Sequence, residues 1–205
     1  KHKLNIIITS THLANDFGYT KNEIVADGFE IYDEVETLMS SNTRLGMAKS
    51  IGLGFIGIAE SLSKLKPDLL ICLGDRYEIF AGAYAASLLN IPIAHIHGGE
   101  LTYGSIDDKF RHAITKASTI HFACTETYRK RIIQMGEQKK NVYNFGALAV
   151  ERVKKIKNIS LSELNNIFGL NLNNGYILVT IHSETNAKQN TSKFMKPIIT
   201  ALESF

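Results

Sequence analysis

Short apolar runs alternate with longer helical patterns along the chain. The apolar runs occupy residues 4–10, 68–74, 91–97, 119–125, 142–146 and 176–182. Most of them are continuously apolar, as strands buried on both faces of a parallel sheet should be. Helical patterns lie near residues 43–65, 77–89, 108–117, 126–135, 148–157, 160–168 and 191–204. This order predicts an α/β fold with a doubly wound, Rossmann-like parallel sheet.

A change in composition divides the chain into two parts. Residues 153–174 are rich in Lys, Asn and Ser and contain no strong strand pattern, and a new apolar run begins at Tyr176. We therefore expect a Rossmann-like domain over residues 1–155, followed by a linker and the start of a second domain over residues 156–205. Because one strand and one helix cannot form a core, we expect most of the second domain to be missing. A first strand before residue 1 can be missing as well.

Composition and charge exclude several classes of protein. The 23 basic and 20 acidic residues are interspersed, with a formal net charge of +3, so no basic tail or stripe indicates a nucleic-acid partner. No uninterrupted apolar stretch approaches the roughly 20 residues that span a bilayer, and no signal-peptide pattern opens the chain. Cys72 and Cys124 both lie in apolar runs, where a thiol usually behaves as a small buried hydrophobe. A cytoplasmic protein without a membrane partner is expected.

Three glycines have the spacing of a dinucleotide-binding motif. Gly52, Gly54 and Gly57 are followed by Asp75 about twenty residues later. That motif requires a strand directly before the glycines, whereas the residues here are helix formers and polar residues. We interpret them as a glycine-rich helix face that lets another helix approach, and we expect no nicotinamide or flavin cofactor.

Polar residues follow three of the apolar runs, at the edge of a doubly wound sheet where ligands bind. Asp75 and Arg76 follow one run, Gly98, Gly99 and Glu100 follow the next, and the last run ends in His182, with Glu184 beyond it. Asp75 could instead cap the following helix, and Arg76 could pair with a phosphate or simply with Glu78.

Histidines on the third run allow two interpretations. His95 and His97 alternate on a strand, which predicts side chains on one face, with Glu100 just beyond a Gly-Gly turn. A metal site is conceivable, but it needs further ligands from other elements, so we expect none. We expect His95 to be buried or hydrogen-bonded, and His97 and Glu100 to belong to an active site.

A second cluster follows directly on this loop. Asp107 and Asp108 begin a helical pattern whose first turn favours carboxylates, and Arg111 and His112 come one turn later. Capping alone explains one aspartate. The whole cluster is therefore expected to contribute to the same site.

One long segment resembles a known enzyme family. The residues GDRYEIFAGAYAASLLNIPIAHIHGGELTYGSIDDKFRHAITKASTIHF are similar to the bacterial hydrolysing UDP-N-acetylglucosamine 2-epimerases of sialic and legionaminic acid synthesis. The likeness begins at THLANDFGYT and continues through TETYRKRIIQMGE and VYNFGAL to VTIHSET, so it covers nearly the whole chain. Such an ordered series is far more specific than a single GDR motif.

The resemblance implies a two-domain GT-B fold that binds the UDP-sugar substrate between two Rossmann-like domains. It places the catalytic groups on Asp75, His97, Glu100, Asp107 and His182. Substrate contacts fall on Arg76, Gly98, Gly99, Asp108, Arg111, His112 and Glu184. No cofactor or metal is implied, and the family commonly forms homodimers or homotetramers. Related epimerases, including the animal enzyme, carry glutamate where this chain has His97, so the base is either His97 or Glu100.

The implied reaction is loss of UDP to give an unsaturated glycal, followed by hydration to a free N-acetylmannosamine-type sugar. The UDP-sugar can be UDP-N-acetylglucosamine or its 2,4-diacetamido-trideoxy analogue. Alternatives are a GT-B glycosyltransferase, a non-catalytic nucleotide-sugar-binding domain and, less favoured, a metal-dependent hydrolase built on His95, His97 and Glu100.

Overall fold

The computed structural model describes residues 2–41, 43–181 and 192–204. Its contacts divide the chain into two compact units. The first unit comprises Lys1–Thr102 and Asp107–Ala147, and the second comprises Tyr103–Ile106 and Leu148–Phe205. Each unit is described separately below.

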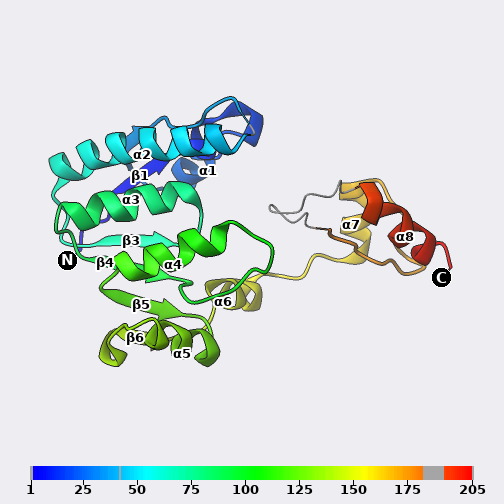
Figure 1. Ribbon diagram of the computed structural model, residues 1–205. Helices are drawn as coiled ribbons and strands as arrows, with labels where there is room; N and C mark the ends of the chain where they lie inside the picture. The colour runs from blue at the N-terminus through cyan, green and yellow to red at the C-terminus, as the bar shows by residue number, and fades with distance from the viewer. Residues whose placement is uncertain (1, 42, 182–191, 205) are drawn as a thin grey trace. The chain divides into compact units, whose positions relative to one another are not determined.

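Six parallel strands form two sheets in the first unit (Figure 1). In the first sheet β1 (Ile6–Thr9) pairs with β2 (Ile31–Val35). The second sheet has the order β3 (Leu70–Leu73), β4 (Ile93–Ile96), β5 (Ile120–Ala123) and β6 (Val142–Asn144). The predicted α/β fold and the first five predicted strands are confirmed.

The sequence did not predict β2 or the short helix α1 (Lys21–Ala26) before it. β2 reads IYDEV, and its side chains alternate between partly buried and exposed until Val35, which is buried. With Asp33 on its partly buried face and Glu34 on its exposed face, β2 lacks the continuous apolar run that marks the other strands.

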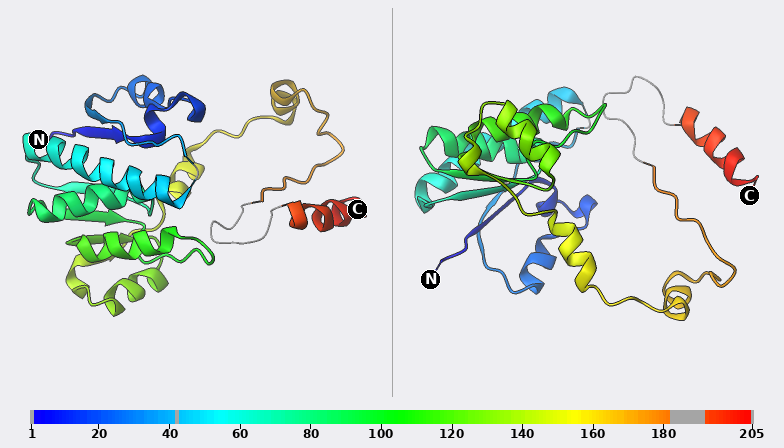
Figure 2. Two further views of the ribbon diagram at one scale, coloured as in Figure 1. Left: turned by 45° about the horizontal axis from the view of Figure 1, so that its top comes forward. Right: turned by 90° about the horizontal axis from the view of Figure 1, so that it is seen from below.

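Helices α2 (Arg44–Leu65), α3 (Tyr77–Leu88) and α4 (Asp107–Ala117) lie side by side on one face of the strands, and α1 lies on the other (Figures 1 and 2). The fifth helix, α5 (Glu126–Gln134), packs against β5 and β6. Three short 3-10 helices complete this unit, η1 (Ser10–Leu13), η2 (Asn15–Phe17) and η3 (Lys139–Asn141). Burial of apolar side chains between the helices and the sheet forms the core, around Leu62, Ile93 and Ile114.

The three glycines that resemble a dinucleotide motif lie inside α2, but only Gly54 lies on a helix-packing face, since a Cβ at Gly52 would meet nothing within 4 Å and Gly57 faces β2. Gly54 faces Ala81 of α3, and a Cβ at Gly57 would collide with Val35 of β2. The same helix is the one described helix that is long and apolar enough to span a membrane. Its contacts with α3 and with β1 and β2 identify it as a core helix.

The two sheets begin at a common junction. The Ser10 hydroxyl, just after β1, donates a hydrogen bond of 2.8 Å to the Glu78 carboxylate in α3. From this junction the chain builds outwards in two directions, from β1 to β2 and from β3 to β6. Doubly wound proteins bind ligands at such a reversal, beyond the carboxyl ends of the strands.

The second unit contains α6 (Leu148–Lys155), α7 (Leu161–Phe168) and α8 (Ser192–Leu202), close to three predicted helices. The strand predicted over residues 176–182 is wrong for residues 176–181, which form no strand, and residue 182 lies outside the described residues. Its apolar side chains are exposed, Leu178 to 84%. A strand requires a hydrogen-bonded neighbour, and the described part of this unit contains no other strand.

Candidate active site

Most predicted site residues converge where β3, β4 and β5 end and α4 begins. These are the carboxyl ends of parallel, neighbouring strands, so the loops that follow them meet at one edge of the sheet. Two groups of interacting side chains lie here, one centred on Arg111 and one on Glu100.

Arg111 connects the loop after β3 to the start of α4. Its guanidinium, only 6% exposed, pairs with the carboxylates of Asp75 and Asp108, the latter at 3.1 Å. It also reaches the Thr102 hydroxyl at 3.4 Å, while the Thr102 amide donates to Asp108 at 2.8 Å. One buried cation therefore fixes two carboxylates and the loop before α4. We call these four residues the Arg111 group.

Asp75 does not cap the helix that follows it. The N-cap of α3 is Arg76, and no side chain caps its first turn. Arg76 donates two hydrogen bonds, of 3.1 and 3.0 Å, to the buried Glu78 carboxylate. Burial alone would raise the pKa of Glu78, but the hydrogen bonds from Arg76 and Ser10 outweigh it and hold the pKa below its usual value.

His97, Glu100 and Cys124 form the second group, which we call the His97 group. The Glu100 carboxylate accepts a hydrogen bond of 2.7 Å from His97 Nδ1 and one of 2.9 Å from the Cys124 thiol. The side chains of His97 and Glu100 are both 25% exposed. His97 Nε2 has no hydrogen-bond partner within the residues that the structure describes. The imidazole is thus oriented by a carboxylate on one side and open on the other.

The electrostatics of this group keep Glu100 ionised and Cys124 protonated. Burial favours a higher pKa for Glu100, yet hydrogen bonds from Cys124 and His97, with the nearby charge of Arg111, lower it overall. Burial and the Glu100 carboxylate raise the pKa of Cys124 to about 11. Cys124 therefore acts as a hydrogen-bond donor and not as a thiolate nucleophile.

Cys124 was predicted only as a small buried hydrophobe, which is wrong. Unlike the buried Cys72, it is partly exposed and bonds to a site carboxylate. Its position directly after β5, at the same edge as the other site residues, was the signal that could have found it.

His95 lies beneath the site and does not join it. Its Nε2 donates to the Gly74 carbonyl at 2.7 Å, and its Nδ1 lies 3.1 Å from the Thr115 hydroxyl. Burial lowers its pKa to about 4, so it is neutral at pH 7. The prediction of a buried, hydrogen-bonded His95 is confirmed, and a metal trio of His95, His97 and Glu100 is not assembled.

The sequence suggested that His97 continues the alternation of β4, and this prediction is wrong. His97 follows the strand and has a left-handed backbone, with φ of 66°. One potential metal-ligand atom from each of His97, Glu100 and Cys124 lies within 4.8 Å of the other two, a spacing compatible with a metal ion. The hydrogen bonds within the His97 group account for that spacing without a metal ion.

The two glycines of the loop have packing reasons for their small size. A Cβ on Gly98 would lie 3.0 Å from both His95 and Thr115. Gly99, with φ of 76°, leaves no room for a side chain beside Tyr128 and Ile132. Their predicted contacts with substrate stay a prediction.

The remaining predicted residues differ in how the structure places them. Asp107 is the first residue of α4, and its charge contributes to the raised pKa of Arg76, whose main cause is the hydrogen bond to Glu78. Burial lowers the pKa of His112, whose Nδ1 atom has no hydrogen-bond partner among the described residues. His182 and Glu184 lie outside the described residues.

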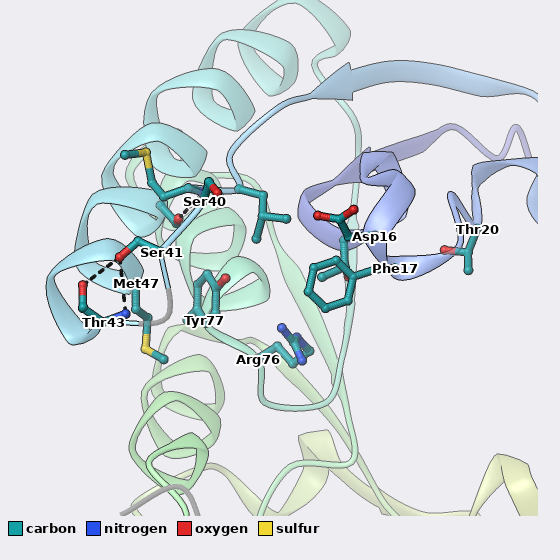
Figure 3. Close-up of a pocket in the computed structure, with 13 residues that line it drawn as sticks. Asp16, Phe17, Thr20, Ser40, Ser41, Thr43, Met47, Arg76 and Tyr77 are labelled. Atoms are coloured by element: carbon teal, nitrogen blue, oxygen red, sulfur yellow. Dashed lines mark hydrogen bonds between the residues drawn. The ribbon is translucent and has the colours of Figure 1, made fainter.

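A cavity of about 860 Å³ opens beside this site, at the junction of the two sheets. It is lined by residues that follow β1, β2 and β3 and by the first turns of α2, and we call it the β1–β3 cavity. Figure 3 shows Asp16 and Phe17 on one side, Met47 and Thr43 on another, and Arg76 and Tyr77 between them. The family likeness over THLANDFGYT includes Asp16 and Phe17, but no site role was predicted for them or for Met47.

A sequence profile described as UDP-N-acetylglucosamine 2-epimerase matches residues 1–205. The chain belongs to this family. It is 37% identical over 201 residues to a Campylobacter jejuni protein named GDP/UDP-N,N'-diacetylbacillosamine 2-epimerase (hydrolyzing), covering 98% of the chain and 52% of that protein. A Legionella pneumophila protein named UDP-N,N'-diacetylbacillosamine 2-epimerase (hydrolyzing) is 36% identical over 179 residues, 87% of the chain and 47% of the relative.

A solved structure supports the same fold for this family member. The UDP-GlcNAc 2-epimerase from Neisseria meningitidis, bound to UDP-GlcNAc, matches with a TM-score of 0.69 and 20% identity, over 83% of this chain and 46% of that one. The chain therefore has the α/β, GT-B type fold of these enzymes and spans about half the length of the curated relatives it matches.

Proposed function

We propose that the protein carrying this chain is a hydrolysing UDP-sugar 2-epimerase that releases UDP and a free 2-epimerised sugar. The observation that carries this proposal is the hydrogen-bonded pair of His97 and Glu100 beside Asp75, at the carboxyl edge of the sheet. The relatives named as hydrolysing 2-epimerases support it.

The chemistry requires UDP to leave as the C2 hydrogen is removed. That hydrogen is not adjacent to a carbonyl, so direct deprotonation would be very slow. As the bond between C1 and the diphosphate oxygen breaks, positive charge develops at C1 and acidifies the hydrogen on C2. A base takes this proton, the C1–C2 double bond forms, and UDP departs with the electron pair. Water then adds hydroxyl to C1, and C2 receives a proton on the opposite face.

His97 is assigned as the base, because its two ring nitrogens have different partners. Nδ1 donates to Glu100, so in the neutral ring Nε2 carries the lone pair that accepts the proton. Glu100 already accepts two hydrogen bonds and has a lowered pKa, which makes it the weaker base. Glu100 then orients the ring and stabilises the imidazolium that forms.

The carboxylates of Asp75 and Asp107 are assigned to the positive charge at C1 and to the return of a proton at C2. Arg111, with Asp108, holds Asp75 in place, since its guanidinium is buried and paired with both carboxylates. Arg76, His112, Gly98 and Gly99 complete the rim. His182 and Glu184, from the second domain, are proposed to contact the diphosphate and the sugar.

Product analysis in deuterated water tests this proposal directly. The complete protein containing residues 1–205 should release UDP and a free sugar with deuterium at C2. The variants Asp75→Asn, Asp107→Asn and Glu100→Gln should each slow UDP release by about 10²-fold or more. Near-normal turnover in all three would remove the proposal. Transfer to an acceptor instead of water would indicate a glycosyltransferase, and binding without turnover would indicate a nucleotide-sugar-binding protein.

A further inference from the structure

The loop that carries the proposed base has no side chains in its middle. His97 and Glu100, whose side chains are bonded at 2.7 Å, are separated only by Gly98 and Gly99, and we call these four residues the Gly-Gly loop. The His97 amide donates to the Phe122 carbonyl at 2.9 Å, which attaches the start of the loop to β5. Because glycine backbones are unusually free to move, the geometry of the reacting pair depends on what holds the two glycines.

One face of α5 packs against the Gly-Gly loop. Tyr128, Arg131 and Ile132 are three and four residues apart, so their side chains share a face of this helix. A Cβ on Gly99 would lie 2.6 Å from the Tyr128 carbonyl oxygen and 2.8 Å from the Ile132 side chain. The missing side chain of Gly99 therefore lets the backbone of α5 approach the loop closely.

Arg131 makes a polar contact across this approach. Its guanidinium donates a hydrogen bond to the Gly99 carbonyl and lies over the Tyr128 ring, 5.5 Å from the centroid. In the part of the chain that the structure describes, no carboxylate forms an ion pair with Arg131, in contrast to Arg111. Hydrogen bonds from a charged donor are stronger than those between neutral groups, so this contact can fix the loop.

A different role for Arg131 is to bind an anionic part of the substrate. Burial lowers the pKa of His112, and the charge of Arg131 contributes to this, so the guanidinium lies near a predicted substrate contact. Two observations favour positioning over substrate binding. The guanidinium is hydrogen-bonded to the loop backbone, and it lies against the ring of Tyr128 on its own helix, where its side chain is partly buried.

We propose that Arg131 is a positioning residue that acts through the Gly99 carbonyl. By fixing the middle of the Gly-Gly loop, Arg131 keeps His97 and Glu100 within hydrogen-bonding distance, without contacting substrate itself. This inference rests on the proposed function and deepens it, since it assigns part of the geometry of the reacting pair to a helix outside the predicted site.

Replacement of Arg131 in the complete protein containing residues 1–205 tests this role. Arg131→Met keeps much of the apolar stem and removes the donor, so kcat for UDP release should fall about tenfold because the reacting pair loses its alignment. KM and inhibition by UDP should stay unchanged, since the contacts with substrate remain. Arg131→Lys keeps a charged N–H donor and should recover most of the loss.

Arg129 provides a matched control on the same helix. It also donates to a backbone carbonyl, that of Val142 at 2.9 Å, and pairs with Glu126 at 3.0 Å. Its contacts lie at β6 and not at the Gly-Gly loop. Arg129→Met should therefore disturb α5 to a similar degree and leave kcat unchanged.

Amide hydrogen exchange, followed by mass spectrometry, measures the same effect without turnover. Exchange reports local opening of the backbone. Arg131→Met should speed exchange in peptides that cover residues 97–102 and leave residues 142–145 unchanged. Arg129→Met should produce the opposite pattern.

Four outcomes overturn the inference. They are a normal kcat in Arg131→Met, a weaker affinity for substrate or UDP in place of a lower kcat, an equal loss of kcat in Arg129→Met, and an Arg131→Lys variant no better than Arg131→Met. The second would show that Arg131 contacts the substrate. If wild type releases no UDP from any UDP-sugar, the proposed function fails, and exchange at residues 97–102 still decides whether Arg131 fixes the loop.

Discussion

The two groups at the carboxyl edge of the sheet contain similar residues but differ in what they leave open. In the Arg111 group one buried cation is paired with two carboxylates, so its charges are committed to one another. In the His97 group a carboxylate accepts two hydrogen bonds and leaves one imidazole nitrogen facing away from it. A closed network fixes geometry, whereas an open chain of donors and acceptors can move a proton. The following variants test that division.

Loss of the His97 Nε2 atom should have the largest effect on turnover. His97→Gln keeps a polar side chain but removes the proposed base, so UDP release and deuterium incorporation at C2 should fall by about 10³-fold or more. Stability should change little, since the His97 side chain is partly exposed. The comparison is with His12→Gln, an exposed histidine bonded only to Thr20. If His97→Gln retains a tenth of wild-type turnover, Glu100 is the better candidate for the base.

Breaking the closed network should act mainly on stability. Arg111→Met removes the cation and leaves Asp75 and Asp108 as neighbouring carboxylates, which should lower the free energy of unfolding by about 3–5 kcal/mol. Lys155→Met is the control, because Lys155 and Glu151 form an exposed pair that should contribute less than about 1 kcal/mol. Urea denaturation measures both. Equal effects of the two substitutions would mean that burial of Arg111 is not what holds the group together.

Acid should lower the free energy of unfolding through His95, which lies beneath both groups. His95 bonds to the carbonyl of Gly74, the residue before Asp75, and burial lowers its pKa from 6.5 to about 4. Because the folded state binds this proton less readily than the unfolded state, the contribution of His95 is complete above pH 6.5. It is lost as the pH falls toward 4.

Between pH 7 and pH 5 this loss amounts to about 2 kcal/mol of unfolding free energy. The unfolding free energy lost between the two pH values should therefore be about 2 kcal/mol smaller for His95→Asn than for wild type and for His12→Asn. Parallel behaviour of all three proteins would show that His95 titrates alike in the folded and unfolded chains.

Substitution of Cys124 should have the smallest effect on turnover. It distinguishes a hydrogen-bonding role of the thiol from a structural one. Cys124→Ala removes one of two hydrogen bonds to Glu100 and should lower kcat about tenfold with little change in KM. Cys124→Ser restores a donor and should recover most of the loss. A structural role would instead make both variants equally active or equally unstable. Cys72→Ser, at the buried cysteine, provides that contrast in a stability assay.

The sequence predicted some strands and missed others, depending on the pattern of apolar and polar residues in each. Apolar runs located β1 and β3 to β6, because polar residues inside these strands are few, chiefly the single histidines His95 and His121. β2 was missed because Asp33 and Glu34 interrupt its apolar residues. The apolar run at residues 176–181 was misread because pattern alone cannot supply a hydrogen-bonded neighbour.

The candidate site followed from one topological rule, that polar residues after parallel strands meet. That rule pointed to Asp75 and Glu100, and the alternation of His95 and His97 on one run added His97, but neither pattern showed which side chains pair with one another. The contact between Asp75 and Arg111 joins residues 36 positions apart, and only the packing of α4 beside α3 brings them together. The role of Cys124 was missed since an apolar context was taken to mean burial.

The left-handed backbone at His97 has an evolutionary consequence. With φ of 66°, this position would be more comfortable for glycine, and strain at a histidine there is of order 1–3 kcal/mol. Selection for heat resistance alone would therefore favour His97→Gly, and selection for turnover would oppose it. Laboratory evolution without an activity screen should lose the imidazole repeatedly, and recovery of that replacement would show that this protein keeps a strained residue here at a cost in stability.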